Sequence, residues 1–351
     1  MPISDEAKSR VRDAVRAVVR RELDTQSRRP DARVTIAGPW TMLDGGPSVW
    51  SVKMHASPDL YRRIRAAFTE TTVKEILLAA AGLKVSRLCL RDTELAFLCA
   101  SAEEYGFSVL AGDERYLFRR DRGKGNYCNA FERLANPDEV GGFRKVYVAS
   151  DQSLVESAML LEDVGDDELF GALLGIPRCC RAAYERFRDQ AAARQFDLIP
   201  YVLENTPEPL SCEHWLNYAT IYFGQSLLSF FPCSFRCPAA AVAARSTYEM
   251  LAECDPAWAA SFLDLQRSNV LYTEYQGVHL FRSPIRDGWI SYGPEDLRST
   301  EPTETAALLR GGDRLAVWDK HSVGIFSGER RIGVLEGDDV AMCVFFQAVA
   351  P

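Results

Sequence analysis

Two pairs of cysteines, about fifty residues apart, are the residues best suited to chemistry in this sequence. Segment 175–180 reads Gly-Ile-Pro-Arg-Cys-Cys, and segment 231–238 reads Phe-Pro-Cys-Ser-Phe-Arg-Cys-Pro. A proline stands beside each pair at the expected start of a helix, where unpaired backbone N–H groups and the helix dipole favour a thiolate. Four such thiolates predict a metal or iron–sulfur site, or a reactive cysteine centre.

The predicted metal ligands are Cys179, Cys180, Cys233 and Cys237. Pro238 disfavours helical angles at Cys237, so the second pair is expected in a turn that ends in a helix cap and directs both sulfurs into one space. Cys179 and Cys180 are adjacent, and on a helix their side chains diverge by about 100°. One of these two is therefore expected to act as ligand or nucleophile while the other packs.

Three chemistries compete for these cysteines. A zinc site needs four N or S ligands, usually spaced two to four residues apart, which fits the second pair better than the adjacent first pair. An iron–sulfur cluster accepts looser spacing. The CxxxCxxC loop of radical S-adenosylmethionine enzymes is absent, because position 240 is Ala240. A metal-free nucleophilic or redox cysteine is the third reading.

One predicted helix, over residues 213–230, offers a lining for the site. Its polar residues Asn217, Tyr222 and Gln225 lie within a strongly apolar segment, where buried polar groups need partners. These three residues are expected to line a cofactor or substrate cleft that leads to the cysteines. His214, at the other end of this helix, would be about 25 Å away and is not expected to be a ligand.

The elements that must position these residues change in character along the chain. Residues 1–30 are expected to form a basic amphipathic helix and a linker. Over residues 31–165 strands, such as those expected at 34–36 and 49–54, alternate with helices, such as those expected to start at Ser57-Pro58 and to span 92–105. This alternation favours an α/β domain with at least some parallel pairing. Residues 166–268 are expected to form a helical domain that carries the cysteines. Residues 269–351 show a period of two and predict a β-rich module. The expected fold class is therefore multidomain α+β.

Composition narrows the class of protein. The chain has 351 residues, a net charge of −8 and ten cysteines. The negative charge argues against nucleic acid as the main partner, and no segment has the length and hydropathy of a membrane span or a signal core. A cytoplasmic location is therefore expected, and at this low density the cysteines are not expected to form a disulfide scaffold. The Gly-Lys-Gly loop at residues 123–125 matches no phosphate-binding pattern and is expected to be a solvated hairpin loop.

The two cysteine segments resemble those of an uncharacterised prokaryotic family of unknown function, over roughly residues 165–250. That family carries a Gly-aromatic-Pro-x-Cys-Cys segment and a later His-Pro-Cys-Ser-x-x-Cys-like segment. Here Ile176 replaces the aromatic residue and Phe231 replaces the histidine, which removes a nitrogen ligand or general base. The resemblance implies a site built on the cysteines but no particular reaction.

The sequence thus favours a metal- or iron–sulfur-dependent enzyme that acts on a small molecule or peptide, in specialised or sulfur-related metabolism. Its reaction class and oligomeric state are left open. The alternatives are a non-catalytic protein that binds proteins or peptides and has structural cysteines, and a metal-free enzyme with a cysteine nucleophile.

Overall fold

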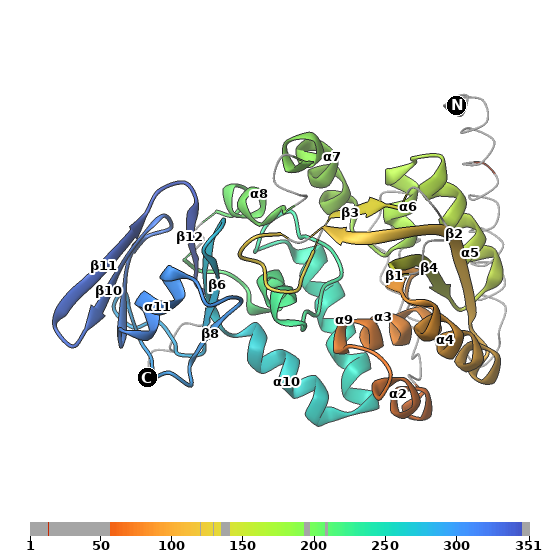
Figure 1. Ribbon diagram of the computed structural model, residues 1–351, viewed down its shortest axis with the longest axis horizontal. Helices are drawn as coiled ribbons and strands as arrows, with labels where there is room; N and C mark the ends of the chain where they lie inside the picture. Colours follow the sequence, from red (N-terminus) through yellow and green to blue (C-terminus); the bar gives the residue numbers. More distant parts are fainter. Residues whose placement is uncertain are drawn as a thin grey trace. The chain divides into compact units, whose positions relative to one another are not determined.

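A computed structural model gives the structure of residue 13 and of residues 57–119, 121–128, 130–134, 141–192, 197–207 and 210–345. Apart from residue 13, the predicted amino-terminal helix and linker, and the strands expected at 34–36 and 49–54, lie outside this part of the chain. The described residues form helices and three antiparallel sheets, so the protein is of mixed α+β class (Figure 1). No helix among them is long and apolar enough to cross a membrane.

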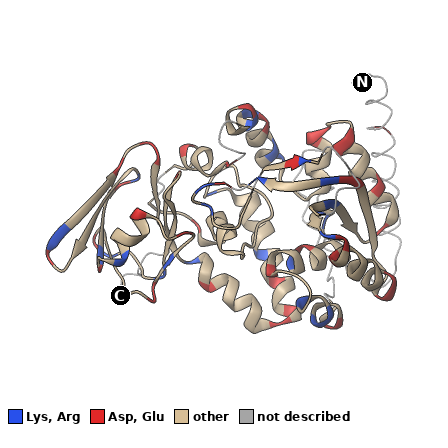
Figure 2. Ribbon diagram, in the orientation of Figure 1, with Lys and Arg blue, Asp and Glu red and all other residues tan. Residues whose placement is uncertain are grey.

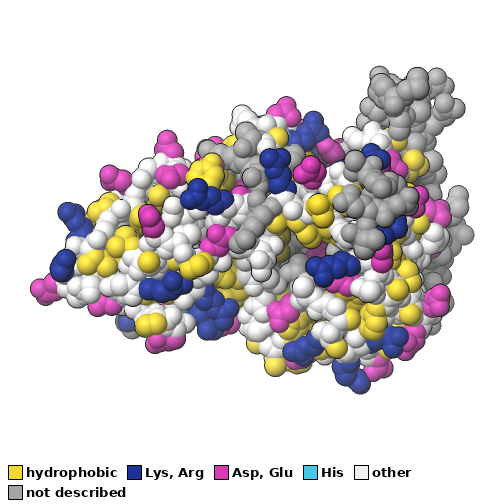
Figure 3. Space-filling model, in the orientation of Figure 1, with side chains coloured by type: hydrophobic (Ala, Val, Ile, Leu, Met, Phe, Trp, Pro, Cys, Tyr) yellow, Lys and Arg dark blue, Asp and Glu magenta, His cyan; other side chains and the backbone are white. Residues whose placement is uncertain are grey.

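The chain divides into two compact units. The first comprises residues 1–117, 132–182 and 253–255, and the second comprises residues 118–131, 183–252 and 256–351. The predicted layering into an α/β domain, a helical middle and a β-rich module stays a prediction. Lys and Arg residues are interspersed with Asp and Glu along the described elements (Figure 2) and on the face drawn in Figure 3, as on an ordinary solvated surface.

The first unit is built on a four-stranded sheet with the order β1-β4-β2-β3. Its elements are α2 (Pro58–Arg65), α3 (Glu70–Ala80), β1 (Ser86–Leu90), α4 (Asp92–Tyr105), β2 (Ser108–Arg119), β3 (Ala130–Arg133), β4 (Phe143–Ala149), α5 (Gln152–Asp163) and α6 (Asp167–Leu173). The chain continues with α7 (Arg178–Ala192).

Parallel pairing was expected in this sheet, and that prediction is wrong. Strand β4 pairs antiparallel with both β1 and β2, so β1 and β2 run in the same direction but are not neighbours. The crossover through α4 does join two parallel strands, as helical crossovers do. However, β4 comes later in the chain and lies between them, so neither pairing is parallel.

Helices cover both faces of this sheet. Tyr147 and Ala149 of β4 belong to one hydrophobic cluster with α5 and α6. Because side chains alternate along a strand, Val146 and Val148 point to the opposite face, where α3 and α4 contact β1 and β4. Burial on both faces explains why the second half of β4, residues 146–149, is a continuous apolar run.

The second unit holds the other two sheets, with the orders β11-β10-β9-β7 and β12-β5-β6-β8. Its helices are α8 (Ile199–Glu204), the 3₁₀ helices η2 (His214–Leu216) and η3 (Tyr218–Phe223), α9 (Pro238–Cys254), α10 (Pro256–Gln266) and α11 (Glu304–Arg310). Its strands are β5 (Asn269–Thr273), β6 (Gly277–Phe281), β7 (Trp289–Ser291), β8 (Leu297–Ser299), β9 (Arg314–Asp319), β10 (Ser322–Ser327), β11 (Arg330–Glu336) and β12 (Val340–Cys343).

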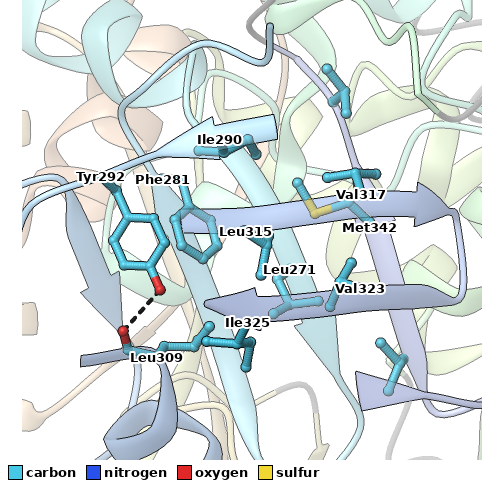
Figure 4. Packing of buried hydrophobic residues seen from close by; sticks show 12 residues of the cluster. Leu271, Phe281, Ile290, Tyr292, Leu309, Leu315, Val317, Val323, Ile325 and Met342 are labelled. Atoms are coloured by element: carbon cyan, nitrogen blue, oxygen red, sulfur yellow. Dashed lines mark hydrogen bonds between the residues drawn. The ribbon is translucent and has the colours of Figure 1, made fainter. Parts of the chain in front are cut away.

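The two sheets and α11 share one hydrophobic core (Figure 4). Leu271 and Phe281 come from one sheet, and Leu315 and Ile325 from the other. Tyr292 lies at the edge of this core, and its hydroxyl donates to the carbonyl of Leu309 in α11 at 2.9 Å. The predicted period of two across residues 269–345 thus corresponds to two antiparallel sheets, with α11 and the short strand β8 as elements that the sequence pattern missed.

A buried histidine in this unit makes stability depend on pH. The side chain of His279 in β6 is fully buried, and its Nδ1 lies 2.9 Å from Oγ of Ser299, its cross-strand partner in β8. Burial lowers the pKa of His279 to about 4, and the nearby Arg310 and Lys124 charges act in the same direction. The unfolded chain therefore binds the histidine proton at a higher pH than the folded chain does.

Lowering the pH from 7 to 5 is expected to cost about 2 kcal/mol of unfolding free energy through His279, because only the unfolded state takes up the proton in this range. Burial raises the pKa of Asp121 to about 6, so Asp121 contributes in the opposite direction. The measurement therefore compares two proteins. Urea unfolding gives the change in unfolding free energy between pH 7 and pH 5 for wild type and for His279→Gln. Equal pH dependence in the two proteins would contradict this prediction.

Candidate metal centre

The first cysteine pair follows a complete helix-ending motif. Helix α6 ends at Leu173, and Gly175, just beyond the cap residue, has a φ of +74° in the left-handed region that glycine tolerates. The backbone N–H of Gly175 donates to the carbonyl of Ala172, and that of Ile176 donates to Gly171. These are the two bonds of a Schellman motif. Pro177 then leads directly into α7, as the sequence predicted, and places both cysteines in the first helical turn.

Adjacency does not separate the two sulfurs of this pair. Sγ of Cys179 lies 3.9 Å from Sγ of Cys180. Two thiolates bound to one zinc ion at 2.3 Å in a tetrahedron are ~3.8 Å apart. The side chains diverge by about 100° around the helix, yet their sulfurs have the spacing of two ligands on one ion. Cys179 is exposed and Cys180 is buried.

The second pair lies in the turn before α9. The N–H of Cys237 donates to the carbonyl of Ser234 at 3.2 Å, and the carbonyl of Cys237 accepts from Ala241 N at 3.0 Å, as at a helix cap. Cys233 is half-buried and Cys237 is 3 % exposed. The predicted turn that ends in a helix cap at Pro238 is therefore confirmed.

A buried phenylalanine between these two cysteines holds the turn. Phe235 is fully buried, and its N–H donates to Oγ1 of Thr206 at 2.9 Å while its carbonyl accepts from Glu213 N at 3.1 Å. Its ring meets the ring of Phe345 edge-on, with 5.1 Å between centroids. These contacts of Phe235 fix the main chain between Cys233 and Cys237.

The four cysteines form one group. The Sγ atoms of Cys179, Cys180, Cys233 and Cys237 all lie within 4.8 Å of one another, which is close enough to hold a metal ion. Cys179, Cys180 and Cys237 stand at helix N-termini, where orphan backbone N–H groups and the helix dipole stabilise negative charge. Two features of the main chain therefore favour thiolates at this site.

The separations bear on which metal group the site suits. One ion at the centre of a tetrahedron requires every pair of sulfurs to be ~3.8 Å apart, and an upper limit of 4.8 Å needs only small adjustments to meet this. A cluster has several irons between its cysteine ligands and needs a wider set of sulfurs. Four sulfurs at these separations could therefore hold a metal ion.

No protein-family model, curated protein or solved structure matches this chain. What the protein does has to be argued from its own residues.

The prediction of one helix over residues 213–230 is wrong. The segment forms the short 3₁₀ helices η2 and η3 and is irregular beyond Gly224, whose φ is +80°. Asn217 is fully buried, and its amide donates to the carbonyls of Gln266 and Ser268 at 3.0 and 2.9 Å. Gln225 is half-buried, and its backbone N–H donates to the carbonyl of Thr220 at 3.2 Å. A cofactor-lining role for Asn217, Tyr222 and Gln225 stays a prediction.

The neighbouring Cys212 is not part of the four-cysteine group. Its N–H donates to the carbonyl of Val344 at 2.8 Å, and burial raises the pKa of its thiol to about 12. Burial also lowers the pKa of His214. Glu213 N donates to the carbonyl of Phe235 at 3.1 Å, so this segment lies beside the second cysteine turn. The expected separation of about 25 Å between His214 and that turn is therefore wrong.

The sequence missed a buried charge cluster in the second unit. The loop around Lys124 was expected to be solvated, and that prediction is wrong, because the Lys124 side chain is 1 % exposed. Its Nζ lies 3.3 Å from Oδ2 of Asp197, donates to the carbonyl of Thr273 at 3.2 Å and lies 3.7 Å from the ring centre of Tyr272. Burial lowers the pKa of Lys124, and the Asp197 charge opposes that shift.

Asp197, the partner of Lys124, is equally buried and fully hydrogen-bonded. Its Oδ1 accepts from the hydroxyl of Tyr222 at 2.9 Å and from Ile199 N at 3.1 Å, and its Oδ2 accepts from the hydroxyl of Tyr272 at 2.8 Å. Burial raises the pKa values of both tyrosines well above the usual range, and the Asp197 charge adds to this. With the lysine, these donors fill the acceptor sites of the carboxylate.

The glycines on either side of Lys124 were the signal for this burial. Gly123 and Gly125 have φ values of +83° and +67°. A Cβ on Gly123 would lie 2.9 Å from the carbonyl group of Tyr275. Glycine here permits a close approach of two backbones, which buries the loop.

Proposed function

We propose that this protein binds a single metal ion, zinc in the first place, through the thiolates of Cys179, Cys180, Cys233 and Cys237, and that it is a metal-dependent enzyme. The observation that carries the proposal is the mutual approach of the four sulfurs to within 4.8 Å, with the adjacent pair at 3.9 Å. Free cysteines that only pack in a core have no reason to converge from two segments about fifty residues apart in sequence.

A chemical role is favoured by the uneven burial of the four ligands. Cys180 and Cys237 are 2 % and 3 % exposed, Cys233 is half-buried and Cys179 is exposed. A structural zinc ion keeps four ligands, while a catalytic one needs a position that substrate or water can take. The exposed Cys179 is the ligand that a small molecule or peptide would reach and displace.

An iron–sulfur cluster is the second candidate, and the adjacency of Cys179 and Cys180 favours it. Zinc ligands are usually spaced two to four residues apart within a pair, whereas cluster ligation tolerates irregular spacing. Specialised or sulfur-related metabolism, and kinship with the uncharacterised family that shares the two segments, are further parts of the proposal. The electronic spectrum of protein purified without oxygen separates the two candidates, because only iron–sulfur centres give broad charge-transfer bands in the visible.

The test of the proposed function is metal and sulfide analysis of protein purified under anaerobic conditions. About one zinc per chain is expected in wild type and a nearly complete loss in Cys233→Ser, because three remaining sulfurs leave the shell open. Cys99→Ser is the matched control, since Cys99 is an exposed cysteine on α4 outside the group, and it should keep the metal.

Iron with matching sulfide in wild type would instead select the second candidate. Wild-type protein that contains no metal, and whose stability is unaffected by Cys233→Ser, would contradict the proposed function. In that case, rapid labelling of one thiol at neutral pH would point to a metal-free cysteine enzyme, and its absence to a binding protein with structural cysteines.

A further inference from the structure

A buried arginine holds the turn that carries the first cysteine pair. Arg181 directly follows Cys180, and its side chain is 4 % exposed. Its Nη1 donates to the carbonyl of Ile176 at 2.6 Å, and its Nη2 donates to the carboxylate of Glu168 on α6 at 3.0 Å. Since Ile176 precedes α7 and Arg181 lies within it, this guanidinium ties the entry turn, the first turn of α7 and α6 together.

Helix α6 is shaped to admit this side chain. A Cβ built on Gly171 would lie only 2.8 Å from Cδ of Arg181, so the arginine stem occupies the space that a larger residue would fill. The carbonyl of Gly171 also accepts the N–H of Ile176 at 3.0 Å. The same glycine thus makes room for the arginine and closes the turn that the arginine holds.

The charge of Arg181 is offset only in part by its ion pair with Glu168. Among the described residues its carboxylate partner is Glu168, whose side chain is 60 % exposed, and the Nε of Arg181 is buried with no hydrogen-bond partner. An exposed counter-ion attracts a buried cation only weakly, because solvent screens the interaction. Much of the free-energy cost of burying the cation is therefore not offset. A divalent ion bound by four thiolates has a net charge of −2. The guanidinium of Arg181, which follows the ligand Cys180 in the sequence, would offset part of this negative charge.

We propose that Arg181 is a positioning residue of the four-cysteine metal centre. It fixes the first turn of α7 so that Cys179 and Cys180 present their sulfurs at ligand spacing, and it places a buried positive charge beside a negatively charged site. The inference rests on the proposed function. Residues that orient metal ligands from outside the coordination shell typically change metal affinity by about 10- to 100-fold when they are replaced.

The experiment compares wild type with Arg181→Met and Arg181→Lys. Zinc affinity is measured by competition with a chromophoric chelator, and Co²⁺ is substituted to record the thiolate-to-cobalt and ligand-field bands. Arg181→Met is expected to weaken zinc binding by about 10- to 100-fold and to reduce the bands typical of tetrahedral four-thiolate cobalt. Arg181→Lys keeps the charge but loses the fork of donors, so an intermediate affinity is expected.

The matched control is Arg188→Met on the same helix. Arg188 is 40 % exposed and lies near Glu185 and Asp189, so its replacement should leave affinity and spectrum unchanged. Wild-type affinity and spectrum in Arg181→Met would overturn the inference, even where stability falls. If Arg181→Met does not fold, Arg181→Lys decides, and wild-type affinity in that variant overturns the inference. Wild type that binds neither metal would contradict the proposed function itself, and the inference with it.

Discussion

Replacing Lys124 by methionine is expected to lower the free energy of unfolding by about 3–5 kcal/mol, because it leaves the buried carboxylate of Asp197 without its counter-charge. The Asp197 side chain is 3 % exposed, so water cannot take the place of the lysine. Three neutral donors would remain on the carboxylate, from Tyr222, Tyr272 and the backbone of Ile199. These donors satisfy lone pairs but supply no net positive charge. Urea unfolding monitored by circular dichroism measures the change.

The double variant Lys124→Met/Asp197→Asn separates the lost charge from the lost packing. Removing both charges is expected to restore at least half of the loss, since a buried pair replaced by neutral groups is often close to neutral in stability. Arg62→Met is the control for an exposed pair, because the Arg62 and Asp59 side chains are 72 % and 67 % exposed, and it should cost less than about 1 kcal/mol. A Lys124→Met variant as stable as the Arg62→Met control would show that the buried pair contributes nothing.

Local elements were predictable where the chain carries its own start and stop signals. The helix expected at 92–105 has the observed bounds of α4, and Gly106 with a φ of +75° ends it. Ser57 caps α2 by accepting from Leu60 N at 3.1 Å, so the predicted start of that helix at Ser57-Pro58 is confirmed. Such signals act over three or four residues and need no knowledge of the rest of the fold.

Predictions that depended on distant segments were wrong. The order of the first sheet depends on where β4 inserts, and nothing local to β1 or β2 specifies that. The apolar segment 213–230 has the composition of a buried helix, yet its polar groups bond to segments far along the chain, such as Asn217 to the carbonyls of Gln266 and Ser268. Tertiary hydrogen bonds replaced the helical ones. Lys124 was missed for the same reason, because its partner Asp197 is 73 positions further along the sequence.

The cysteine site was predictable in its local turns but not in the distance between them. Prolines and a glycine predicted both turns locally, and the turns at 175–180 and 232–238 are as expected. That the four sulfurs approach one another could only be a hypothesis from the sequence, since residue types and spacing give no distance between two segments. The same limit applies to Arg181, whose role follows from its bond to the Ile176 carbonyl and from its contact with Gly171.

Removing the metal is expected to destabilise the protein more than any loss of a single core thiol. A metal that binds only the folded chain adds about 4 kcal/mol when its free concentration is a thousand times the dissociation constant. Urea unfolding of wild type with buffered zinc and with excess chelator should therefore differ by about 4 kcal/mol or more. In Cys237→Ala the difference should nearly vanish, because the fourth ligand is missing.

Cys343→Ala is the matched control for that experiment. Cys343 is 1 % exposed in β12, as buried as Cys237, and lies outside the four-cysteine group. Its loss should cost a similar amount of packing energy with and without chelator, while the response to zinc remains that of wild type. If Cys237→Ala and Cys343→Ala respond to zinc alike, or if wild type unfolds identically with and without chelator, then metal binding is not coupled to folding through these thiolates. If zinc stabilises wild type and Cys343→Ala but not Cys237→Ala, then the metal binds the folded chain through the thiolate of Cys237.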